Sequence, residues 1–73
     1  MVVDEYTSLR LEYNAVIKRY YSGCNYIMEH PETLEKYLKD ILKFKDRLDE
    51  IITKFSRDGK PMTEKEILSG FGN

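Results

Sequence analysis

Along residues 4–57 the apolar side chains recur at steps of three and four, and this spacing limits what the chain can fold into. The first stretch begins with Tyr6, Leu9 and Tyr13, and the second runs from Leu34 to Phe55. Apart from Pro31, which opens the second stretch, neither contains a proline. The pattern predicts an all-α fold with helices over residues 4–29 and 31–57.

The ends of these two helices carry recognisable signals. Asp4 and Glu5 lie where acidic residues favour a helix N-terminus, and Pro31 suits the first position of a helix. Gly23 lies in the apolar seam of the first helix, next to Ser22. The missing side chain indicates either a kink or the close approach of a second helix.

A third, short helix is predicted over residues 64–69. Thr63 and Glu66 have the spacing of a capping box, and Met62 and Ile67 flank it as a hydrophobic staple. The helix must stop before Gly70, so it is too short to be stable without packing. The apolar residues predicted to fold back onto the open end of the two longer helices are Ile67, Leu68 and Phe71.

The connection between the two long helices is only Glu29-His30-Pro31, which forces them to be antiparallel neighbours. The chain is therefore predicted to be a single domain, residues 1–73, built as a helical hairpin. The apolar stripe of the second helix covers roughly 140° of its circumference, more than one neighbouring helix can bury. Two hairpins pairing into a four-helix-bundle dimer would cover both stripes. The alternative is a three-helix monomer in which the C-terminal helix packs across the hairpin.

The short length makes this question of partners important. A chain of 73 residues buries a smaller fraction of its apolar surface than a typical domain does, so it needs an additional source of stability. Cys24 is the only cysteine and cannot form an internal disulfide, and with His30 it cannot supply the ligands of a structural zinc site. Oligomerisation or unusually good helix packing remains.

Charge and composition narrow the function classes. The 12 basic and 13 acidic residues give a net charge of −1, so the whole molecule is not attracted to nucleic acid or to an acidic membrane. The N-terminus lacks the pattern of a signal peptide, and no apolar run is long enough to span a bilayer, so a cytoplasmic protein without membrane contact is expected. Cys24 and His30 are predicted on different helix faces, and no other nucleophile and base, metal ligands or cofactor motif are apparent. We therefore expect no enzymatic activity, metal or cofactor.

The remaining class is a protein that binds another macromolecule. Leu11, Tyr26 and Leu42 are apolar residues predicted to lie outside the main stripes, and they are the candidates for contact with a protein partner or a second subunit. The leading hypothesis is a homodimeric hairpin that acts as a small regulator, adaptor or inhibitor of an unidentified protein. The size and composition would suit a regulator encoded by a phage or a mobile element.

A basic row on the second helix supports an alternative, nucleic-acid binding. Glu32, Asp40 and Glu50 fall in the same sector and reduce its charge, so the row also fits a solvated face with local ion pairs such as Asp40 to Lys43 and Glu32 to Lys36. The five residues of the basic row are Lys36, Lys39, Lys43, Arg47 and Lys54.

Overall fold

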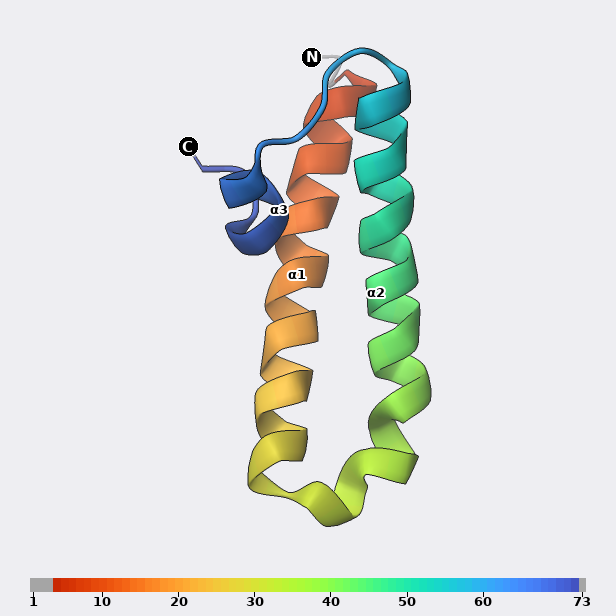
Figure 1. Cartoon of the computed structure of the whole chain (residues 1–73), viewed down its shortest axis with the longest axis vertical. Helices are drawn as coiled ribbons and strands as arrows, with labels where there is room; N and C mark the ends of the chain where they lie inside the picture. Colours follow the sequence, from red (N-terminus) through yellow and green to blue (C-terminus); the bar gives the residue numbers. More distant parts are fainter. Residues whose placement is uncertain (1–3, 73) are drawn as a thin grey trace.

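The computed structural model describes residues 4–72 and is helical, as predicted (Figure 1). Helix α1 spans Glu5–Glu29, a single 3-10 turn η1 spans Pro31–Thr33, α2 spans Leu34–Arg57 and α3 spans Glu64–Ser69. The first turn of the predicted second helix is thus 3-10 and not α-helical. The reason is local: Thr33 donates both its backbone N–H and its hydroxyl to the carbonyl of His30, at 2.9 and 2.7 Å, which tightens this turn.

The predicted starts of the first and third helices are confirmed by their hydrogen bonds. The Asp4 carboxylate accepts from the backbone N–H of Thr7 at 2.9 Å and caps α1. At α3 the capping box is complete, because Thr63 Oγ1 accepts from the N–H of Glu66 and the Glu66 carboxylate accepts from the N–H of Thr63. These bonds satisfy backbone donors that have no partner within the helix.

The two long helices lie side by side and antiparallel, joined at what we call the closed end of the hairpin (Figure 1). Helix α1 continues without a break through Gly23. A β-carbon at Gly23 would collide with the Cδ1 atom of Ile41 on α2. Of the two explanations for this glycine, the structure therefore supports a close helix approach within one chain.

The buried core lies in the other half of the hairpin, which we call the open half. Its tightest positions are Tyr13, Ile51 and Phe55, each 1% exposed. Met62, just before α3, closes the core at the open end as the predicted staple residue. The complete set of buried apolar residues is Tyr13, Ile17, Leu48, Ile51, Phe55 and Met62.

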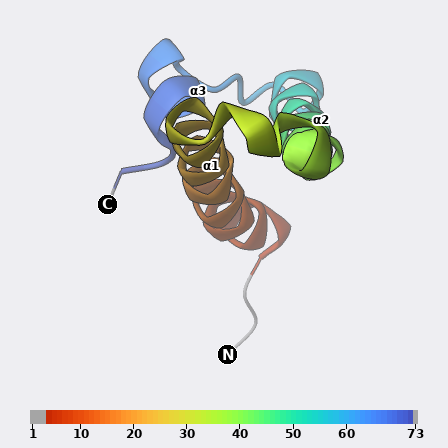
Figure 2. The same ribbon diagram turned by 90° about the horizontal axis from the view of Figure 1, so that it is seen from below.

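Helix α3 and the residues after it fold back onto the open half, on one side of the hairpin (Figures 1 and 2). The Phe71 ring lies 5.7 Å from that of Tyr13 and 5.4 Å from that of Phe55. Tyr13 donates its hydroxyl to the carbonyl of Ile67 at 2.6 Å. The predicted docking of Ile67 and Phe71 is confirmed, but that of Leu68 is wrong: only its backbone carbonyl is used, by the hydroxyl of Tyr21, while its side chain is 56% exposed.

Candidate interaction surface

The closed half of the hairpin, residues 18–47, is poorly covered. Between Ile17 and Leu48 the chain has no buried residue. Helix α3 lies beside the open half and reaches the closed half only at Tyr21, so beyond Tyr21 α1 and α2 pack mainly against each other (Figure 1). Each apolar stripe is wider than the one contact it makes, so its edges remain in water.

One side of the closed half is the apolar face. On α1, Tyr21 and Met28 are two turns apart and therefore share one side of the helix. On α2, Leu34, Leu38 and Leu42 are spaced by four residues and form a continuous row. The apolar face also includes Leu68 of α3, which contacts Tyr21. Its members, all exposed by more than two fifths, are Tyr21, Met28, Leu34, Leu38, Leu42 and Leu68.

The side of the hairpin opposite the apolar face is polar, and ion pairs join α1 to α2 there. Arg47 of α2 binds both carboxylate oxygens of Glu12 on α1, with Nε at 2.5 Å and Nη2 at 2.7 Å. This bond lowers the pKa of the Glu12 carboxyl, and Glu12 raises the pKa of Arg47 in turn. Lys54 lies 3.5 Å from Glu5 on α1. Because these pairs link one side of α1 to one side of α2, helical periodicity places the apolar face on the other side, where α3 also lies.

A second cross-helix contact ends this polar side near the open end. The Tyr6 hydroxyl donates to the Asp58 carboxylate at 2.8 Å, and Lys54 lies 3.1 Å from the same carboxylate. The hydrogen bond from Tyr6 is the main reason that the pKa of Asp58 is lowered, with the Lys54 ammonium second. These contacts hold the ends of α1 and α2 together and offer no unpaired group.

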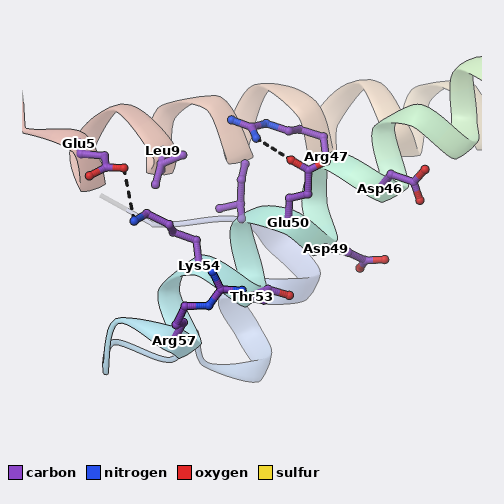
Figure 3. A pocket seen from close by; sticks show the side chains of 10 residues that line it. Glu5, Leu9, Asp46, Arg47, Asp49, Glu50, Thr53, Lys54 and Arg57 are labelled. Carbon is purple, nitrogen blue, oxygen red and sulfur yellow. Dashed lines mark hydrogen bonds and ion pairs between the residues drawn. The ribbon is translucent and has the colours of Figure 1, made fainter.

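An open hollow lies over this polar side, and most of its lining residues are charged. Figure 3 shows Glu5 of α1 directed at Lys54 of α2, and Arg47 directed at Glu50 on the same helix. The hollow that these residues line has a volume of about 710 Å³. Of the three basic residues that line the hollow, Arg47 and Lys54 form ion pairs with carboxylates, and Arg57 forms none within residues 4–72. No histidine, cysteine or serine is among the lining residues. Among residues 4–72, no three His, Cys, Asp or Glu side chains are grouped so that they could hold a metal ion.

The three candidate contact residues do not form one patch. All are exposed: Leu11 by 64%, Tyr26 by 45% and Leu42 by 48%. Leu42 belongs to the apolar face, and Tyr26 lies at the closed end of the other side, where its ring contacts Tyr37 at 5.7 Å. Leu11 lies in the open half, about 20 Å along α1 from Tyr26, on the edge away from the buried residues.

The basic row is divided by its local partners. Arg47 is held by Glu12 and Glu50, and Lys54 by Glu5 and Asp58. The remaining members, Lys36, Lys39 and Lys43, form no ion pair within residues 4–72, so the expected pairs of Lys43 with Asp40 and of Lys36 with Glu32 are absent there. The row is therefore not a continuous positive strip, and its free charges are at the closed end.

Within residues 4–72 no helix has the length and apolar character needed to cross a bilayer. Comparison of the chain with protein-family models, with curated proteins and with solved structures gave no match. Any function must therefore be argued from the surfaces themselves.

Four members of the apolar face were missed as contact residues, because the sequence places them in the apolar stripes of the two long helices. They are Tyr21, Met28, Leu34 and Leu38. Helical periodicity places such residues on the apolar side of a helix but does not say how far a neighbour extends over them. The usable signal was the width of the stripe on α2, which exceeds what one neighbour covers.

Proposed function

We propose that this chain is a non-catalytic protein interaction module that works as a homodimer of helical hairpins. The observation that carries the proposal is the uncovered closed half, where residues 18–47 contain no buried side chain and supply five exposed members of the apolar face. Monomeric soluble proteins rarely leave a contiguous apolar surface of this kind in water.

A second copy is the occupant that fits the apolar face. Each hairpin leaves the same apolar face uncovered, so a two-fold pairing of two such faces buries both at once. Among the charged residues next to the row, Lys45 and Asp49 form an ion pair at 3.3 Å, which reduces the charge that they bring to this contact. The product is a four-helix bundle in the closed halves, with each α3 beside its own open half.

The test compares two leucine substitutions by size-exclusion chromatography with light scattering. The unmodified chain is expected to be a dimer at micromolar concentration. Leu38→Glu should weaken the dimer by at least about 30-fold, because each of two copies loses about 1 kcal/mol of leucine burial and gains a charge at the contact. Leu11→Glu is the matched control, since Leu11 is more exposed but lies outside the apolar face.

Two results would overturn the dimer. One is a monomeric unmodified chain that is also resistant to heat. The other is dissociation by Leu11→Glu with an intact Leu38→Glu dimer. Circular dichroism of both variants controls for folding. Neither should lose helix, because Leu38 and Leu11 lie outside the buried core at 42% and 64% exposure and glutamate is a good helix former.

A further inference from the structure

The side of the closed half opposite the apolar face has a groove of about 250 Å³ between α1 and α2. Its floor is Gly23 against Ile41, where the missing side chain lets the two helices approach. Aromatic rings form its walls: Tyr26 and Tyr37 meet edge to face at 5.7 Å, and Phe44 continues the lining toward the open half. From Tyr37 to Phe44 the groove is about 10 Å long, enough for one or two turns of a bound segment.

The groove is apolar inside and positive at its rim. Asp40 is its only charged lining residue, and Lys36 and Lys43 lie one helical turn on either side of Asp40. Arg19 lies one turn from Gly23 on α1. None of these three cations forms an ion pair within residues 4–72, so they exceed Asp40 by two positive charges. Glu29 lies one helical turn from Tyr26 at the closed end of α1 and reduces this excess to one positive charge.

We infer that this groove binds a short acidic, apolar segment of a partner protein. Apolar side chains of the segment enter between Tyr26, Tyr37 and Phe44, while its carboxylates reach Arg19 and Lys43 at the rim. Charge of one sign around an apolar centre gives both specificity and faster encounter with a partner of the opposite sign. The inference rests on the proposed function, because it supplies the partner of the interaction module, but it uses the side of the hairpin that a dimer leaves open.

The same cations and rings suit nucleic acid less well. Stacking of bases requires free aromatic faces. The Tyr26 ring is already packed on His30 with centroids 4.6 Å apart, and the Lys36 ammonium lies over the Tyr37 ring at 5.3 Å. A phosphate backbone following the basic row would also meet the carboxylate of Asp40, whereas a peptide can place an apolar or hydrogen-bonding group there.

The test is a selection from a displayed library of random short peptides, with the unmodified full-length chain as the target. Selected peptides are expected to combine Asp or Glu with Leu, Phe or Trp. One of them, synthesised with a fluorophore, is then titrated with the double variant Lys36→Glu/Lys43→Glu, with Tyr26→Ala and with Lys65→Glu. Lys65→Glu is the charge-reversal control, with half the charge change of the double variant, because Lys65 is exposed on α3 and remote from the groove.

Affinity should fall at least about tenfold in the double variant and in Tyr26→Ala, and change less than about twofold in Lys65→Glu. Selection without acidic enrichment, or equal loss in Lys65→Glu, would overturn the inference. Binding of a single-stranded oligo-dT that depends on Lys36 and Lys43, with no selected peptide, would instead assign the groove to nucleic acid. Titration of the peptide with the Leu38→Glu variant separates the two proposals. If the unmodified chain is a monomer and the peptide still binds, the groove is supported and the dimer is refuted. If the unmodified chain is a dimer and no peptide binds, the dimer is supported and the groove is refuted.

Discussion

Gly70 gives the most direct test of how α3 is held against the hairpin. It ends α3 with φ 85° and ψ 178°, a region of backbone space that is essentially restricted to glycine. A β-carbon there would lie 2.5 Å from Asn14 Oδ1 on α1. The Asn14 side chain cannot move away freely, because Oδ1 accepts from the Phe71 N–H at 2.6 Å and Nδ2 donates to the Phe71 carbonyl at 3.0 Å.

The expected effect of Gly70→Ala follows from these two contributions. Backbone strain costs about 1–3 kcal/mol, and disturbing the Asn14 bonds adds about 1 kcal/mol, so the free energy of unfolding should fall by about 3 kcal/mol. A folded chain of this length has roughly 4–11 kcal/mol in total. The variant should therefore show a clearly lower urea midpoint, measured by far-UV circular dichroism, with Phe71 released from Tyr13 and Phe55.

Two other glycines separate strain from contact. Gly59 has φ 76°, but a β-carbon added there would meet no atom within 4 Å, so Gly59→Ala should lose only about 1 kcal/mol. Gly72 has neither a positive φ nor such a neighbour, and Gly72→Ala should change stability by less than about 0.5 kcal/mol. If Gly70→Ala were no more damaging than Gly59→Ala, the clasp between Asn14 and Phe71 would not contribute as described.

Three further outcomes are expected. Tyr13→Phe should lower the free energy of unfolding by about 1 kcal/mol in urea titrations, because the hydroxyl bond to α3 is lost, and an unchanged midpoint would contradict this. Glu12 and Asp58 have lowered pKa values, so their contribution to the free energy of unfolding is complete at neutral pH and is lost from about pH 4 downward. In Glu12→Gln the melting temperature should therefore fall less steeply as the pH is lowered below about 4. Amides of residues 18–29 and 34–47 should exchange with deuterium faster than those of the open half in dilute protein and slow down at high concentration, whereas a concentration-independent rate would argue against the dimer.

Local signals in the sequence predicted the elements well because each depends on neighbouring residues. The capping box at Thr63 and Glu66, the start of α1 at Asp4 and the hairpin turn at Pro31 all form as expected. The sequence does not predict the 3-10 form of the first turn after His30, because this form depends on the carbonyl group to which Thr33 donates. Gly23 was identified as a special position, but only the structure distinguishes a kink from contact with another helix.

Long-range contacts were harder to foresee. Asn14 has no feature in the sequence that predicts its bonds to the Phe71 backbone, because they join residues 57 positions apart. Arg47 was assigned to a basic row by its place on α2, yet its charge is taken up by Glu12 on α1. Periodicity describes one helix at a time, so it cannot say which charges and apolar edges a second helix will cover.

The position of α3 connects the fold to the proposed function. Helix α3 has 6 residues, so it can cover only part of a hairpin whose arms have 25 and 24 residues. Tyr13 and Asn14 hold α3 and Phe71 over the open half, so α3 leaves most of the closed half uncovered. The closed half in turn differs on its two sides, since the row through Leu38 is apolar whereas the groove at Tyr37 has a positive rim. A hairpin built in this way can pair with its own copy on one side and still present a distinct, charged groove to a different protein on the other.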